Sequence, residues 1–116
     1  MTTPADTLKA RIRADLTSAL KVRDSAQASL LRVLLAALDN AEAVPIGAAH
    51  ARYQERAFGD PSVEVPRMIL SAEAVAGIIA KEQAEREAVA ADFERLGRPD
   101  DAVRLRQEAS WVAQYR

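Results

Sequence analysis

The chain has 116 residues, the size of one ordinary domain, which argues against a two-lobed enzyme with a cleft between separate domains. Hydrophobic residues make up 49% of it, but 25 residues are alanine and only 4% are aromatic. We therefore expect a core of small and aliphatic side chains in helices. The formal net charge of −1 argues against a uniformly basic nucleic-acid binder. The absence of cysteine excludes disulfides, thiolate catalysis and cysteine-ligated metal centres.

The sequence also indicates where in the cell the protein is located. Its longest apolar stretch, residues 30–38, is interrupted by Arg32 and is far shorter than the roughly 20 residues that a bilayer span needs. The N-terminal segment carries no secretory apolar core. With no cysteine present, these features predict a cytoplasmic protein without a membrane span.

Apolar residues recur at helical spacing in two early segments. The first predicted helix runs from about residue 5 to 23, with Thr3 as its N-cap and Pro4 in its first turn. Lys9 and the other basic residues of this helix are expected to lie largely off its apolar stripe. The second predicted helix runs from residue 24 or 25 to 43. Its apolar arc, which includes Val33, is broad enough to contact more than one neighbour, either within the domain or across a dimer.

Between about residues 44 and 70 the pattern breaks, because three prolines and two glycines interrupt it. We expect a long irregular insertion there, with room for a short helix over 48–58 and an extended stretch over 61–66. Ser71 is the predicted N-cap of a third helix that ends at Leu96, followed by a Gly97 C-cap. Val89 and Leu96 are among its apolar positions.

A fourth helix is predicted from Pro99 to the C-terminus, with Val103 among its apolar positions. The short connection before it pairs the third and fourth helices as an antiparallel hairpin. The fold class predicted is therefore all-α: a small bundle of two antiparallel helical hairpins, forming one domain over residues 1–116, with the long irregular insertion between them.

The residue inventory offers little for catalysis. His50 is the only histidine, so a zinc site with two histidines cannot form, and we expect this residue at the surface. No phosphate-binding loop, dinucleotide-binding turn or nucleophile elbow occurs. Glu82 and Glu85 could make an acid/base pair, but spacing favours ion pairs of Glu82 with Arg86 and of Lys81 with Glu85. We expect no catalytic residue, no metal and no cofactor.

Charge is unevenly distributed along the chain. Residues 1–38 hold six basic and three acidic side chains, a net charge of +3, which leaves −4 for the remainder. The first predicted hairpin could therefore present a weak phosphate-binding face. Arginine outnumbers lysine throughout, 13 to 3, and this general bias is the competing explanation.

Several short motifs occur in a specific order. The first half contains Leu8-Lys9 and the stretches 20–24, 31–38 and 40–42. The second half contains Leu70-Ser71, the stretch 73–75, Lys81-Glu82, Arg86 and the stretch 97–100, followed by Glu108 and Tyr115. In order and spacing these motifs resemble the GatB/YqeY family. The chain departs from the family pattern at Asp101 and Leu105, in the insertion, and in its ending, Tyr115-Arg116.

The resemblance implies a helical domain like the tail of the amidotransferase subunit that handles tRNA, where this region contacts the tRNA while other domains do the chemistry. A family-level label of carbon–nitrogen ligase activity with glutamine as amido-N-donor follows from it. From the resemblance we expect this chain to lack the family's second, C-terminal domain. The implied partners are tRNA or an amidotransferase-type protein complex.

The positions carried over fall into three groups. Candidate RNA-binding or partner-binding residues are Arg32, Lys81, Arg86 and Arg98. Candidate members of an internal polar network are Asn40, Glu42, Glu82 and Glu108. Gly97 is a candidate helix cap.

Each of these residues could instead have a purely structural role. Arg32, within an apolar face, could be a partly buried arginine paired with Glu82 or Glu108. Asn40 and Glu42 could tie the end of the second helix to the third, and Arg98 could bond helix-terminal carbonyls.

Three functional hypotheses follow. The first is a non-catalytic, tRNA-contacting accessory module related to tRNA-dependent amidation. The second is a protein-interaction or homodimerisation module with no RNA role, which buries the wide face of the helix from Leu30 to Ala41. The third and least favoured hypothesis is that the chain is an enzyme.

Overall fold

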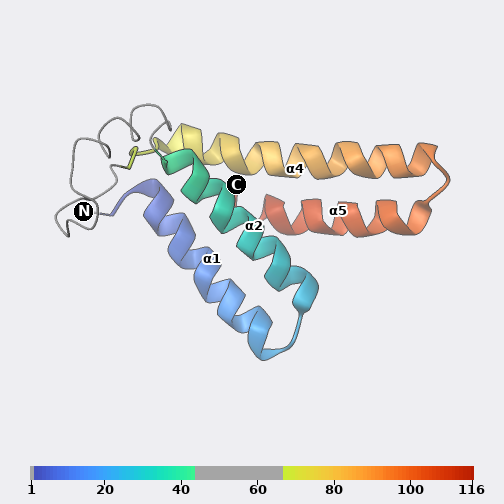
Figure 1. Ribbon diagram of the computed structural model, residues 1–116, viewed down its shortest axis with the longest axis horizontal. Coiled ribbons are helices and arrows are strands. Elements are labelled where there is room, and N and C mark those ends of the chain that lie inside the picture. Colours follow the sequence, from blue (N-terminus) through green and yellow to red (C-terminus); the bar gives the residue numbers. More distant parts are fainter. Residues whose placement is uncertain (1, 44–66) are drawn as a thin grey trace, which may run out of the picture.

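A computed structural model describes residues 2–43 and 67–116 (Figure 1). These two ranges form the helices α1 (Pro4–Lys21), α2 (Ser25–Glu42), α4 (Ala72–Arg95) and α5 (Pro99–Ala113). No strand occurs in them, so the all-α prediction is confirmed, and the helices begin and end close to the predicted residues. His50 and the predictions for 48–58 and 61–66 lie outside the described residues.

Local sequence explains where the helices begin. Thr3 and Asp6 form a capping box at the start of α1, in which each side chain accepts from the other residue's backbone N–H. Asp24 caps α2 by accepting from the backbone N–H of Gln27 at 3.1 Å, and Ser71 caps α4 in the same way. The predicted caps at Thr3 and Ser71 are confirmed.

The turn between α4 and α5 needs a left-handed residue. Gly97 has φ of +72°, a conformation that costs glycine little because it has no Cβ. The chain then reverses, and the backbone N–H of Arg98 donates to the carbonyl of Phe93 at 2.8 Å. The predicted Gly97 cap is confirmed, and the turn brings α5 back along α4.

Two antiparallel hairpins meet at an angle, with α1 packed mainly on α2 and α4 mainly on α5 (Figure 1). Helix α2 lies at the centre and contacts each of the other three helices. Most of its apolar arc is therefore covered inside the chain by the other three helices, although Val33 on this arc is 45% exposed. The largest fully buried side chains are Ile12, Leu31, Leu34, Leu38, Ile79 and Val112.

The molecule is elongated, with principal extents of 55 × 32 × 27 Å. The α4–α5 turn projects well past the first hairpin (Figure 1), whereas the C-terminal residues contact α1. Among the described residues, no helix combines the length and apolarity that a bilayer crossing requires.

Two glycine substitutions should have opposite effects on stability. Gly97→Ala forces a Cβ into the left-handed region and should lower the free energy of unfolding by about 1 kcal/mol or more. Gly77→Ala lies inside α4, where an added Cβ meets no atom within 4 Å, and should raise it by about 0.5–1 kcal/mol. Urea unfolding of both variants measures the difference. Equal effects of the two would contradict the cap.

Candidate functional site

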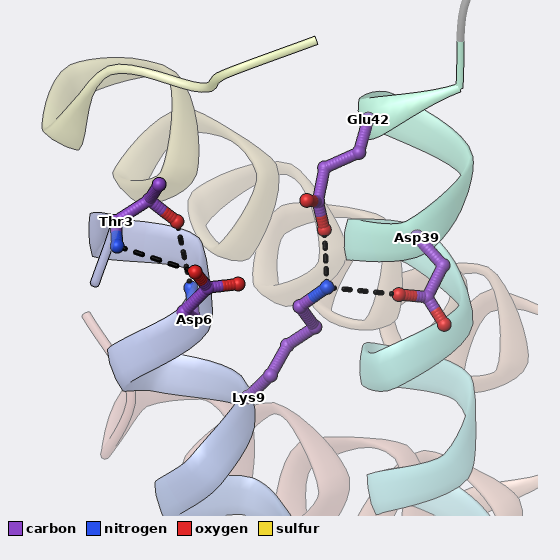
Figure 2. A network of polar contacts seen from close by, with 5 residues as sticks. All are labelled: Thr3, Asp6, Lys9, Asp39 and Glu42. Atoms are coloured by element: carbon purple, nitrogen blue, oxygen red, sulfur yellow. Dashed lines mark hydrogen bonds and ion pairs between the residues drawn. The ribbon is translucent and has the colours of Figure 1, made fainter. Parts of the chain in front are cut away.

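A buried lysine joins the two helices of the first hairpin (Figure 2). Lys9 on α1 is only 3% exposed, and its ammonium donates to Asp39 Oδ1 at 3.1 Å and to Glu42 Oε1, both on α2. Glu42 is also buried, whereas Asp39 is half exposed at the rim. The hydrogen bond to Glu42 raises the pKa of Lys9 above its usual 10.5, and burial opposes it.

The expectation that Lys9 lies off the apolar stripe is wrong. Lys9 precedes the fully buried Ile12 by three residues and therefore lies on nearly the same side of α1. The sequence contained a signal for this contact. Asp39 and Glu42 are three residues apart near the end of α2, so their carboxylates lie on one face of that helix. In an antiparallel hairpin the end of α2 faces the start of α1.

Glu42 also lies where the chain leaves α2 and returns toward α4. Its backbone carbonyl accepts from the N–H of Met68 at 2.7 Å, and Ala43 and Arg67 form an isolated antiparallel bridge. Glu42 was predicted to tie the second helix to the third. Its carboxylate instead binds Lys9 of α1, while Asn40 is exposed.

A second polar network lies in the other hairpin. Arg86 on α4 contacts Glu82 Oε2 at 2.7 Å and approaches Glu108 Oε1 on α5, 3.6 Å from its Nε. The three side chains are mostly buried. The Nε atom has no hydrogen-bond partner within the described residues, and the Glu108 carboxylate is its nearest charged neighbour. Arg86 thus links the middle of α4 to α5 through Glu108.

The buried arginine expected at position 32 is therefore found at position 86. Arg32 is exposed, because it lies on the side of α2 away from the core, and it does not meet Glu82 or Glu108. The predicted polar network forms in part: Glu82 and Glu108 share Arg86. The sequence predicted the pair of Glu82 with Arg86 from its spacing, but not that Arg86 also meets Glu108 on α5.

The remaining predicted cations contact carboxylates of their own helices. Lys81 is 3.9 Å from Glu85, as its spacing predicted, and its side chain is 78% exposed. Arg98 lies 2.8 Å from Asp101 and stacks over the ring of Phe93. Together with Arg32 on α2 and Arg86 inside the second hairpin, these residues do not form one patch.

A groove of about 380 Å³ lies between α2, α4 and α5. Leu30 and Val33 line it from α2, Trp111 and Arg104 from α5, and Arg86 from α4. Val33 was predicted as a core position, yet it is 45% exposed. The sequence indicated the apolar side of α2. It did not indicate that α2 and α5 lie far enough apart at this point to leave Val33 partly exposed.

The C-terminal residues fasten the second hairpin to α1. The Tyr115 hydroxyl donates to Asp15 Oδ2 at 2.6 Å, and Arg11 lies over the Tyr115 ring while donating to the carbonyl of Gln114 at 3.0 Å. Burial, and next the hydrogen bond to Asp15, raises the pKa of Tyr115 well above its usual 10.0.

These contacts neutralise charge and join helices. Within residues 2–43 and 67–116, no group of three or more histidine, cysteine, aspartate or glutamate side chains could hold a metal ion.

Comparison of the chain with known protein families, characterised proteins and solved structures finds no match. Function is therefore inferred from the charges and surfaces of this chain.

Removing Lys9 should destabilise the first hairpin strongly. Lys9→Met leaves the buried Glu42 carboxylate without its cation and should lower the free energy of unfolding by about 3–5 kcal/mol. The double variant Lys9→Met/Glu42→Leu should recover most of this loss, because no charge then stays buried alone. Lys21→Met, at an exposed position of α1, is the control and should change stability by less than about 0.5 kcal/mol. Urea unfolding measures all three.

Stability should fall at alkaline pH. Both Lys9 and Tyr115 have folded-state pKa values above the unfolded ones, so their contributions are full below about pH 10 and are lost as pH rises further. Unfolding free energies between neutral pH and pH 12 test this. Tyr115→Phe and Lys9→Met/Glu42→Leu should each flatten the decline. A decline unchanged in both would contradict the assignment.

Proposed function

We propose that the chain is a non-catalytic, cytoplasmic helical module that contacts RNA phosphates, those of tRNA in the first instance, through the exposed cations of its first hairpin. Resemblance to the GatB/YqeY family supports tRNA as the partner. The observation that carries the proposal is a difference between the hairpins. The basic side chains of α4, of α5 and of the turn between them have carboxylate partners, whereas the exposed basic side chains of the first hairpin have none among the described residues.

Carboxylates of the first hairpin are already engaged elsewhere. Asp6 and Asp24 cap helices, Asp15 accepts from Tyr115, and Asp39 and Glu42 bind Lys9. No ion pair within residues 2–43 and 67–116 involves the hairpin's exposed cations, which are Arg11, Arg13, Lys21, Arg23 and Arg32. Arg11 is engaged by the carbonyl of Gln114, and the other four remain. A phosphate can approach them without displacing a carboxylate.

The second hairpin differs. Carboxylates lie within ion-pair distance of its cations Lys81, Arg86, Arg95, Arg98, Arg104 and Arg106. A phosphate that binds there must compete with a carboxylate on the same hairpin. Of the four cations selected from the sequence, Arg32 is thus the best placed for RNA, and Arg86, at 14% side-chain exposure, the worst.

Amidation chemistry, on this proposal, belongs to other components. The paired side chains described above hold helices together, and the module would act as an accessory in an amidotransferase-type complex. Glutamine-dependent ammonia release by the purified chain alone would contradict a non-catalytic role.

The groove between α2 and α5 favours a second candidate function, protein binding. Its walls combine the apolar Leu30, Val33 and Trp111 with Arg104 at the rim, a composition typical of protein contact surfaces. Trp111 is the only tryptophan of the chain, so its fluorescence reports directly on this groove.

RNA binding should depend on salt and on the first hairpin. Fluorescence anisotropy of labelled tRNA at about 50 and about 150 mM salt should show weaker binding at the higher concentration. Lys21→Gln/Arg32→Gln should reduce the slope of log affinity against log salt by roughly two, about one for each lost phosphate contact.

Arg95→Gln/Arg106→Gln is the matched control, because it removes the same charge from the second hairpin. It should leave the slope unchanged. No binding at low salt, or equal losses in the two double variants, would contradict the proposal.

A further inference from the structure

One face of α4 changes character along its length. Seven positions separated alternately by four and three residues share this face: Val75, Ile79, Glu82, Arg86, Val89, Phe93 and Leu96. Such spacing is typical of a helix that packs along one continuous seam. The seam has an apolar beginning, a charged middle and an apolar end.

Burial differs between the two apolar sections. Val75 and Ile79 are 7% and 0% exposed, because the first hairpin covers them. Val89 and Leu96 are 41% and 72% exposed, and Phe93 is half-buried. Val89 and Leu96 were predicted as apolar positions of the third helix, and the structure leaves both without a complete cover among the described residues.

Helix α5 repeats the pattern. Asp101, Leu105, Glu108, Val112 and Tyr115 follow the same alternation of four and three residues. Val112 and Tyr115 are buried in the core, Glu108 meets Arg86, and Leu105 is half-buried beyond it. Both helices therefore continue an apolar face past the charged middle toward the α4–α5 turn.

Geometry explains why this face stays open. Helix α4 has 24 residues and is about 36 Å long, whereas α2 has 18 residues and is about 27 Å long. The first hairpin also leaves the second at an angle, so the part near the α4–α5 turn projects alone (Figure 1). We call Val89, Phe93, Leu96 and Leu105 the distal patch.

We propose that the distal patch packs against the distal patch of a second copy of this chain. The two α4–α5 hairpins run antiparallel about a two-fold axis and form a four-helix bundle. This orientation places the first hairpins at opposite ends of the dimer. A parallel arrangement brings both first hairpins to the same end, where they compete for space.

Charge around the distal patch favours a second copy over a strongly charged partner. The tip from Asp92 to Arg106 carries four acidic and four basic side chains, a net charge of zero. These are Asp92, Glu94, Asp100 and Asp101, and Arg95, Arg98, Arg104 and Arg106. Most of these charges are already paired within the chain, such as Asp101 with Arg98 and Arg104, so two copies of this neutral tip can approach without net repulsion. RNA would require an excess of positive charge.

The proposed dimer interface can extend beyond the distal patch and reach the usual size of a specific interface. A specific interface buries about 800 Å² on each partner, more than four side chains supply. The groove lined by Val33 and Trp111 also includes Arg86, which is one turn from Val89 on the same α4 face. The projecting tip of the second copy can extend into this groove. The inference goes beyond RNA binding, because the exposed cations belong to the other hairpin.

Sedimentation equilibrium of the full chain over a range of concentrations tests the proposal. We expect a dimer, and Leu96→Asp should raise its dissociation constant by at least about 100-fold, since each dimer loses two apolar contacts. Val103→Asp is the matched control: Val103 is 67% exposed and lies about 200° around α5 from Leu105, on the far side of the hairpin. It should not change the dissociation constant. Helical circular dichroism of both variants verifies that they fold.

A crosslinking experiment tests the orientation. Because the chain has no cysteine, Leu96→Cys and Val103→Cys each introduce a single thiol. Since an antiparallel two-fold seam sets Leu96 of one copy against Val89 of the other, a short bismaleimide should join Leu96→Cys chains to added Val89→Cys chains more readily than it joins two Leu96→Cys chains. It should not join two Val103→Cys chains. A wild-type monomer at all concentrations would overturn the proposal, as would a dimer that Leu96→Asp leaves intact. If tRNA binding fails while the dimer forms, only the proposed function is refuted.

Discussion

Burial of the Lys9 ammonium is the constraint on which the first hairpin depends. A buried cation is tolerated only beside an anion, so α1 and α2 must pair in the register that brings Lys9 to Glu42 and Asp39 (Figure 2). Apolar contacts alone restrict this register less, because leucine and alanine accept several neighbours. The same pairing holds Glu42 where its carbonyl receives the N–H of Met68. The approach to α4 is thus tied to the register of α1 on α2.

A comparable constraint acts in the second hairpin. Arg86 needs both Glu82 and Glu108, and this fixes α5 against α4 between the core and the α4–α5 turn. On the core side of this network the seam is buried by the first hairpin. On the other side it is exposed. The charged middle therefore separates an apolar surface used for folding from one that is available for association.

The two hairpins also differ in how they use charge. Carboxylates of the first hairpin cap helices or bind Lys9 and Tyr115, which leaves its exposed cations without carboxylate partners among the described residues. In the second hairpin, nearby acidic and basic residues neutralise one another. The near-zero net charge of the whole chain therefore conceals an uneven distribution, with an excess of positive charge on the first hairpin and balanced charge at the tip of the second.

Helix positions, the caps at Thr3 and Ser71, the Gly97 turn and the ion pairs of Lys81 with Glu85 and Glu82 with Arg86 could be predicted from the sequence. Each depends on residues within a few positions of one another, where helical spacing alone determines the geometry. The hairpin pairing of α4 with α5 followed from the short connection between them.

Other features required the tertiary structure. Lys9 rather than an uncharged neighbour is buried, Arg86 rather than Arg32 meets Glu108, and Val33 and Leu96 stay exposed. These outcomes depend on the angle at which the hairpins cross and on how far the first covers the second. Periodicity determined which side of each helix is apolar. Only the packing of the two hairpins decided which part of that side is covered, because coverage depends on residues far apart in the chain.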